Sequence, residues 1–201
     1  MTQKLIETAK ELRKRGFTTG EIADQLNVSI DTAQWLTIQK SISSEPKDAP
    51  NDIAINWNTI SGSAARLRYA SGAMADAALK YGPVDIIVGI TSSGVPFATL
   101  IADYLDIEQE TNTGLAIFHP TKHRDDAESA GVLSANFSSV QDKKVMIVDD
   151  VITSGKTIRE IINFLKAEGA TPVVVTVLID KTGLQEIEGV PVESLIKVSR
   201  V

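Results

Sequence analysis

The sequence lacks cysteine altogether and has only two histidines, His119 and His123, among its 201 residues. The absence of cysteine excludes disulfides, thiol nucleophiles and cysteine-ligated zinc or iron–sulfur sites. Two histidines are too few for a histidine-rich metal site. We therefore expect no metal ion that is held directly by the side chains of this protein.

Long apolar segments are absent as well. The longest, residues 172–179, is too short to span a bilayer and is interrupted by Thr176. The first ten residues carry Lys4 and Glu7 and have no apolar core of signal-peptide length. With 43% hydrophobic and 23% charged residues, the composition is that of an ordinary globular protein. We expect a soluble, cytoplasmic protein with no membrane partner.

An excess of basic charge is also missing, since the formal net charge is −6. An acidic protein does not bind nucleic acid through bulk charge, so a DNA-binding role needs a local basic surface. Up to residue 45, six basic side chains match six acidic ones, so the rest of the chain carries the whole net charge of −6.

Residues 41–52 (SISSEPKDAPND) have the composition of a linker or a long loop. These features predict an N-terminal domain at 1–45, a linker at 46–52 and a larger domain at 53–201.

Strand and helix patterns alternate in the larger domain. Helices are expected at 57–80, 95–105 and 157–168, and strands at 84–90, 115–118, 132–137, 145–148 and 173–179. The apolar run VDIIVGI at 84–90 is typical of a parallel strand that is covered on both faces. The alternation predicts an α/β fold with an open, mostly parallel sheet flanked by helices. Ligands of such sheets bind beyond the carboxyl ends of strands, here after Ile90 and Val148.

The most informative segment is 145–157, with the sequence VMIVDDVITSGKT. An apolar strand brings Asp149 and Asp150 to its carboxyl end, and a turn then begins a helix. Backbone N–H groups of such a turn and helix N-terminus bind anions. Carboxylates beside an anion site suit a ligand with both a phosphate and hydroxyl groups, such as a ribose 5-phosphate. The expected anion-binding residues are Thr153, Ser154, Gly155, Lys156 and Thr157.

Two alternatives fit part of this segment. A Walker A nucleotide loop needs a glycine where Asp150 stands, and a carboxylate there would face a triphosphate. An acidic pocket of the receiver type, or simply a capped helix after a strand, needs only the aspartate pair. The complete order of apolar strand, two aspartates and TSGKT favours the ribose phosphate site over both.

The same segment resembles the motif of type I phosphoribosyltransferases that binds phosphoribosyl diphosphate (PRPP). The resemblance covers about residues 53–201 and implies the fold of that family, with PRPP accompanied by Mg²⁺. Residues 88–96 look like the family's diphosphate loop, which often contains a non-proline cis peptide. The diphosphate-binding residues implied by the resemblance are Thr91, Ser92, Ser93 and Gly94.

The family also closes a loop over its site, and residues 118–135 lie in the matching position. The resemblance makes Lys122, His123 and Arg124 candidates for a role in catalysis, because positive charge on a closing loop stabilises the departing diphosphate. A solvated surface loop without a specific role is the alternative for each of these residues.

Within the family, the best resemblance is to orotate phosphoribosyltransferases, carried by DDVITSGKTIRE, LKAEGAT and VLID. Those enzymes place an orotate-binding arginine directly after the aspartate that ends the next strand, whereas here Asp180 is followed by Lys181. Lys181 is therefore the candidate base-binding residue. The family's N-terminal base-binding stretch is not recognisable around Ser61-Gly62, and its loop cluster of Lys and Arg before His-Gly is missing. We expect weak or absent orotate turnover.

The N-terminal domain has helical signals only. Residues 18–21 (TTGE) have the form of a capping box, and 21–29 fit the second helix and turn of a helix-turn-helix. Its internal positions would be Ile22, Ala23, Leu26 and Val28. Ser29 would cap a recognition helix that runs to about Gln39. The candidate DNA-contacting residues, assigned as solvent-facing by position, are Ser29, Thr32, Gln34 and Trp35, with Trp35 also partly in the core.

A helix-turn-helix before an orotate-transferase-like domain resembles archaeal transcriptional regulators described as orotate phosphoribosyltransferase-like, and a Gram-positive purine repressor combines similar parts. The resemblance implies a homodimeric regulator that binds duplex DNA, senses PRPP or a nucleotide, and controls genes of sugar or nucleotide metabolism. One alternative is an active enzyme that converts orotate and PRPP to orotidine 5′-phosphate and diphosphate, and another is a bifunctional protein. For residues 1–45, a dimerisation module stays open, because their charge is neutral.

Overall fold

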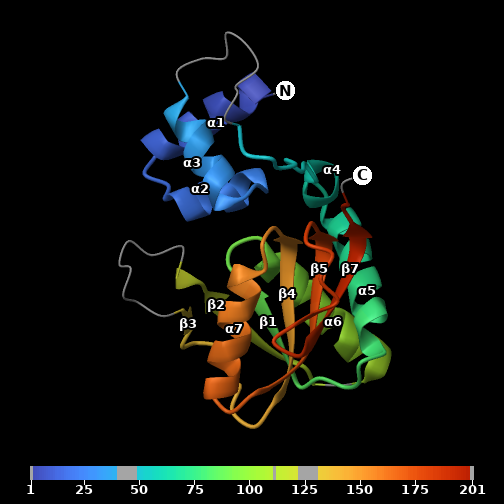
Figure 1. Cartoon of the computed structure of the whole chain (residues 1–201). Helices are drawn as coiled ribbons and strands as arrows, with labels where there is room; N and C mark the ends of the chain where they lie inside the picture. Colours follow the sequence, from blue (N-terminus) through green and yellow to red (C-terminus); the bar gives the residue numbers. More distant parts are fainter. Residues whose placement is uncertain (1, 40–48, 111, 122–130, 200–201) are drawn as a thin grey trace. The chain divides into compact units, whose positions relative to one another are not determined.

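The computed structural model describes residues 2–39, 49–110, 112–121 and 131–199 (Figure 1). Contacts divide the chain into two units, and the first boundary between them falls between Trp57 and Asn58. Each unit has a hydrophobic core of its own.

The described part of the first unit contains three helices: α1 (Thr2–Lys14), α2 (Thr19–Leu26) and α3 (Ile30–Ile38). The predicted capping box is confirmed, since Thr18 and Glu21 bond each other's backbone N–H groups at the start of α2. Ser29 caps α3, as predicted, by accepting a hydrogen bond from the Thr32 backbone N–H. The four predicted internal positions are buried and share a core with Ile6 and Leu36.

Residues 49–55, which we call the strap, are bound to this first unit. The Ser29 backbone N–H donates a hydrogen bond to Asp52 Oδ2 at 2.6 Å. The Asn27 side chain donates to the Ile55 carbonyl at 3.1 Å. The last residue of the predicted linker is therefore tied to the start of α3, while residues 46–48 of that linker lie outside the described residues.

The described strands of the second unit form one seven-stranded arrangement in the order β3-β2-β1-β4-β5-β7-β6. Their bounds are β1 (Ile86–Ile90), β2 (Gly114–His119), β3 (Val132–Leu133), β4 (Lys144–Ile152), β5 (Thr171–Asp180), β6 (Glu186–Ile187) and β7 (Val190–Lys197). The five inner strands pair in parallel, and β3 and β6 pair antiparallel at the two edges. The prediction of a mostly parallel sheet is confirmed.

Helices cover both faces of this sheet (Figure 1). The helices of the second unit are α4 (Asn58–Ser61), α5 (Ala64–Leu79), α6 (Gly94–Gln109) and α7 (Lys156–Ala167). The buried isoleucines of α7 share a core with Val88, Ile147 and Val175 of the sheet. On the other face, Gly89 lies against α6 and the Thr176 hydroxyl donates to a carbonyl of α5. Coverage on both faces explains why all five residues of β1 are buried.

Two predictions about individual elements are wrong, and two strands were not predicted. The helix expected at 57–80 is broken after α4, where the backbone of Ser63 is extended, with φ −145° and ψ 120°. Ser63 then caps a new helix, α5. The strand expected at 132–137 is only two residues long, and the sequence interpretation omitted β6 and β7.

Candidate functional site

The strands β1 and β4 are neighbours, but the chain leaves them in opposite directions across the sheet. The helix α6 connects β1 to β2, and α7 connects β4 to β5 on the other side. Such a reversal of strand order is a topological switch point, where open α/β sheets bind ligands beyond the carboxyl ends of their strands. The two motifs singled out in the sequence lie at this point, because residues 91–93 follow β1 and residues 153–155 follow β4.

The loop after β1 and the end of β4 meet at Gly94. A Cβ on Gly94 would lie 2.5 Å from the Val148 carbonyl oxygen and 3.2 Å from Asp149 Oδ1. The Thr91 backbone N–H donates to the Phe118 carbonyl at 2.9 Å, which ties the loop to β2. The Thr91–Ser92 peptide is cis, as the resemblance implied. Only glycine at position 94 allows the two motifs to approach this closely.

Neither of the two helices that begin at this site has a side-chain cap. Ser93 precedes α6 and Gly155 precedes α7, and neither position makes a side-chain capping hydrogen bond. In contrast, Thr18, Ser29 and Ser63 cap α2, α3 and α5. A helix N-terminus has unpaired N–H donors and a partial positive charge. Two N-termini without side-chain caps, both at the carboxyl ends of neighbouring strands, therefore suit an anionic ligand.

The two acids of the motif lie in the last part of β4 and are largely buried, with 9% of Asp149 and 8% of Asp150 exposed. The Asp150 backbone N–H donates to Asp149 Oδ1 at 2.9 Å. Buried carboxylates need hydrogen-bond donors or a cation to compensate for lost hydration. Each carboxylate oxygen can accept more than one hydrogen bond, so the pair can also accept from the hydroxyl groups of a ligand.

The turn between β4 and α7 places the predicted anion-binding residues together. Gly155 has a φ of +75°, a conformation that glycine adopts at little cost. Ser154 and Lys156 are exposed, whereas Thr153 and Thr157 are half-buried. The sequence therefore placed these five residues correctly on one turn and the first residues of one helix.

Sequence reasoning missed a segment that lies against this turn. A Cβ on Gly155 would lie 3.2 Å from Ile187 Cδ1 and 3.7 Å from Leu184 Cδ1. The segment includes β6, which is too short to show a periodic pattern. The alternation of buried Val190 and Val192 in β7 is the one signal that pointed to a strand nearby.

Lys181, the predicted base-binding residue, is half-buried directly after β5. Its backbone N–H donates to the Ile152 carbonyl at 3.0 Å, next to the turn that follows β4. The buried Asp180 carboxylate accepts hydrogen bonds from the Thr182 N–H and hydroxyl at 2.7 and 2.6 Å and from the Gly183 N–H at 3.1 Å. Asp180 therefore holds the turn that carries Lys181. The loop candidates Lys122, His123 and Arg124 lie outside the described residues.

In the first unit, the four candidate DNA-contacting residues differ in their exposure to solvent. Gln34 is exposed, and Ser29 and Trp35 are half-buried. The prediction that Thr32 faces solvent is wrong, since only 9% of it is exposed. Its hydroxyl lies 2.9 Å from Ser29 Oγ, so Thr32 belongs to the cap and core side of α3.

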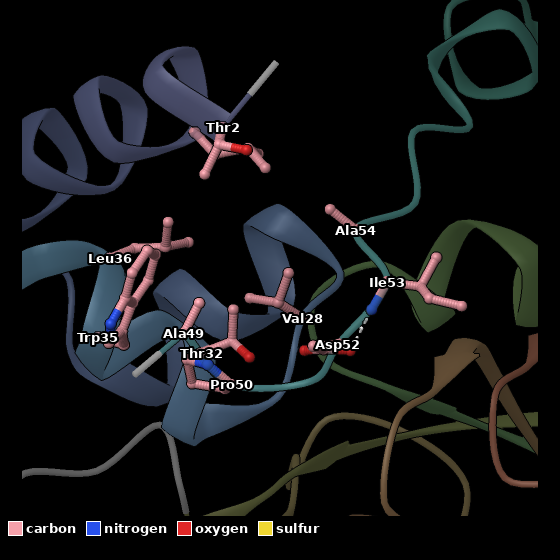
Figure 2. A pocket seen from close by; sticks show the side chains of 11 residues that line it. Thr2, Val28, Thr32, Trp35, Leu36, Ala49, Pro50, Asp52, Ile53 and Ala54 are labelled. Atoms are coloured by element: carbon pink, nitrogen blue, oxygen red, sulfur yellow. Dashed lines mark hydrogen bonds between the residues drawn. The ribbon is translucent and has the colours of Figure 1, made fainter. Parts of the chain in front are cut away.

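A cavity of about 440 Å³ lies within the first unit, between α1, α3 and the strap (Figure 2). Its walls are mainly apolar and include Leu5, Trp35 and Ile53. The Asp52 carboxylate at its edge accepts hydrogen bonds from the backbone N–H groups of Ser29 and Ile53, at 2.6 and 2.7 Å. The carboxylate is therefore already engaged in holding the strap.

The described part of the chain contains neither a membrane-spanning helix nor a cluster of metal ligands. No helix there has the length and hydropathy needed to cross a membrane. No group of three or more acidic or histidine side chains there is arranged to hold a metal ion.

The strand order and the site define the class of the second unit. The family model of the phosphoribosyl transferase domain matches residues 58–192. The orotate phosphoribosyltransferase of Aeropyrum pernix shares the fold with a TM-score of 0.60 and 19% identity, over 94% of this chain and 93% of that one. The adenine phosphoribosyltransferase of Rhodothermus marinus DSM 4252 has a TM-score of 0.58 and 22% identity, over 76% and 90% of the two chains. The second unit has the type I phosphoribosyltransferase fold, as predicted.

Relatives of similar length extend the likeness to the whole chain. The transcriptional regulator GfcR of Methanobrevibacter smithii is 58% identical over 204 residues, covering 100% of both chains. GfcR of Methanosphaera stadtmanae is 51% identical over 100% of both, and GfcR of Haloferax volcanii is 42% identical over 98% of this chain and 96% of its own. The chain belongs to this GfcR family of transcriptional regulators that contain a phosphoribosyl transferase domain.

Proposed function

We propose that the protein regulates transcription by binding duplex DNA, and that its phosphoribosyl transferase domain binds PRPP or a nucleotide as an effector. One observation supports the effector site most strongly. Two helix N-termini that have no side-chain cap lie at the same end of the strands as the buried Asp149 and Asp150. PRPP has matching groups, because its phosphates accept backbone N–H bonds and its ribose hydroxyls donate to carboxylates. The relatives named as transcriptional regulators support the regulatory role.

The effector is proposed to bind together with Mg²⁺. This ion is usually bound by ligand phosphates and one or two carboxylates while it keeps several waters, rather than by a cage of protein ligands. The ion would arrive on the diphosphate and would lie near the buried Asp149 and Asp150 carboxylates without being held directly by them. The ion would reduce repulsion between the diphosphate and these two acids.

DNA binding is proposed for the first unit. Two short helices joined by residues 27–29, the second of them capped by Ser29, have the order expected of a helix-turn-helix. Local positive charge comes from α1 and the residue after it, namely Lys4, Lys10, Arg13, Lys14 and Arg15. Helix-turn-helix proteins commonly read two half-sites about 34–36 Å apart as dimers. We therefore propose a homodimer, working in the compartment that holds the genome, which is the cytoplasm expected from the sequence.

Catalysis is the alternative function, because an enzyme and a sensor use the same residues to bind PRPP. Lys181 argues against orotate as a substrate, since an ammonium group cannot form the bidentate pair that a guanidinium makes with a planar carboxylate. The observation that favours catalysis is the fold shared with an orotate phosphoribosyltransferase. We propose that orotate turnover is weak or absent.

Calorimetry of PRPP with Mg²⁺ tests the effector site. Each charge-assisted hydrogen bond contributes about 1.5–3 kcal/mol, so we expect the variant with both Asp149→Ala and Asp150→Ala to bind PRPP at least tenfold more weakly. Asp142→Asn is the matched control, because Asp142 is exposed outside the site and asparagine tolerates its φ of +59°. Unchanged PRPP affinity in the double variant contradicts the assignment of Asp149 and Asp150 to the effector site.

An assay of orotate turnover tests the alternative function. A kcat of about 1–10³ s⁻¹ would establish that the protein is an enzyme.

A further inference from the structure

The solvent face of α3 has a restricted composition. Ile30 is 43% exposed and Ile38 is 69% exposed, and the exposed Gln34 lies between them at four-residue spacing. Residues four apart lie on the same side of a helix. The helix contains no lysine or arginine, and its one charged residue is the exposed Asp31. This face therefore presents two branched apolar side chains on either side of one amide, with a carboxylate beside them.

This composition limits the bases that α3 can recognise in a major groove. The commonest contact to guanine is a bidentate one from arginine or lysine to O6 and N7, and α3 has neither residue. Glutamine pairs with adenine N6 and N7, and apolar side chains contact the methyl group of thymine. The Asp31 carboxylate only accepts hydrogen bonds, so it can pair with the amino group of cytosine or adenine but not with guanine O6 and N7.

We propose that α3 reads an A·T-containing subsite in the major groove, with Gln34 pairing to an adenine and Ile30 and Ile38 contacting thymine methyl groups. The proposal rests on the DNA-binding function proposed above. Ile30 and Ile38 are separated by about 12 Å along the helix axis at 1.5 Å per residue. This separation corresponds to roughly three to four base-pair steps of 3.4 Å. The contacted bases therefore lie within one short subsite, with the adenine between the thymines.

Phosphate contacts must then come from outside α3, and α1 provides the charge for them. Lys4 and Lys14 are exposed on α1. Two neighbouring cations are partly engaged within the protein, because Arg13 donates to the Phe17 carbonyl and Arg15 pairs with Glu11 at 3.1 Å. Phosphate contacts set the position on DNA and base contacts set the sequence, so α1 and α3 have separable roles.

An apolar stripe on a helix also suits a second copy of the same helix. Two isoleucines flanking an amide bury much less than the 800 Å² or so per partner of a stable interface. The basic residues of α1 in the same small unit have no comparable role in such a contact. The observations therefore favour DNA over a contact between copies.

Selection of duplexes from a random pool by the full chain, with and without PRPP and Mg²⁺, tests the proposal. We expect an enriched half-site that contains adenine and thymine at the positions contacted by α3. Gln34→Ala should relax the preference for one adenine, with a loss of about 5- to 150-fold in affinity for the selected site. Gln25→Ala is its matched control, because Gln25 is exposed on α2.

Deoxyuridine in place of thymine removes only the methyl group and tests the isoleucines. The unmodified protein should bind the uracil duplex more weakly than the thymine duplex, whereas Ile30→Ala or Ile38→Ala should bind the two equally at the position contacted. Ile107→Ala, a 59% exposed isoleucine of α6, should behave like the unmodified protein. Circular dichroism confirms that each variant is folded.

The possible failures are distinguishable. A pool without enriched sequences overturns the proposed DNA binding together with this inference. An enriched site that is insensitive to uracil, or at which Gln34→Ala changes a G·C position, leaves DNA binding intact and overturns the assignment of α3. A change in sedimentation mass in Ile30→Ala without a change in base preference shows that α3 is a contact between copies.

Discussion

Single residues set how closely the two halves of the candidate site approach, and Gly94 is the clearest case. Its α-hydrogen faces the Val148 carbonyl and the Asp149 side chain, at a distance where no Cβ fits. The loop after β1 therefore contacts the end of β4 through backbone atoms, which places the N-terminus of α6 beside the aspartate pair.

We expect Gly94→Ala to destabilise the second unit and to weaken PRPP binding. The added Cβ would lie 2.5 Å from the Val148 carbonyl oxygen, and forced overpacking of this kind costs about 1–3 kcal/mol. Urea unfolding measures the change. Gly72→Ala is the control, because a Cβ there lies 3.4 Å from the Tyr104 ring and alanine raises the helix propensity of α5 by up to about 1 kcal/mol. Equal stability of Gly94→Ala and the unmodified protein would show that the loop and β4 separate easily.

At the scale of elements, ion pairing joins the end of α5 to β7. Lys80 pairs with Glu193, and the Tyr81 hydroxyl donates to the same carboxylate at 3.2 Å. Burial raises the pKa of Glu193, but the hydrogen bonds from Lys80 and Tyr81 together lower it by more, so the pKa lies below its ordinary value. The hydrogen bond to Glu193 is the main reason that the pKa of Lys80 is raised.

These directions predict how the contact depends on pH. A lowered pKa of Glu193 means that its stabilisation is present above the ordinary value of 4.5 and is lost as the pH falls through the folded-state pKa. The raised pKa of Lys80 means that its contribution is present below 10.5 and is lost as the pH rises through the folded-state pKa. Glu193→Gln should therefore lower Tm more at pH 7 than at pH 3. Glu186→Gln, an exposed substitution in β6, should show no such difference.

The strap is the corresponding contact in the first unit. Asp52→Ala removes the acceptor for the Ser29 and Ile53 backbone N–H groups, a loss comparable to that of a helix cap, about 0.5–2 kcal/mol. We expect faster amide hydrogen exchange at Ser29 and Ile53 than in the unmodified protein. Asp31→Ala removes an exposed acid from α3 and should leave both amides protected. Unchanged exchange at Ser29 in Asp52→Ala would mean that the strap does not depend on this carboxylate.

At the scale of the whole molecule, the two cores predict two separable functions. The sheet, the helices α4 to α7 and the core of the second unit are all formed by residues after position 57. Deletion of residues 1–57 should therefore preserve PRPP affinity, measured by calorimetry, and abolish DNA binding, measured by gel shift. If the shortened protein retards the same promoter fragment at equal affinity, the first unit does not bind DNA and a dimerisation module is the better explanation.

The amino-acid sequence by itself determined the features that depend on nearby residues. Thr18, Glu21 and Ser29 encode helix starts because a cap is satisfied within three residues of itself. The apolar runs before Thr91 and Asp149 encode buried strands, and the turn TSGKT encodes a helix start, because these hydrogen bonds are local. The α/β fold of the second unit was predictable for the same reason.

Only the tertiary structure decided which of these local features meet. The contact of Gly94 with Asp149 depends on β1 and β4 being neighbours, and strand order is set by packing between segments far apart in the chain. The burial of Thr32 and the tie between Asp52 and Ser29 likewise depend on segments that fold back on α3. The two-residue edge strand β6 was missed because so short a strand is stabilised by its neighbour β7 rather than by its own periodicity.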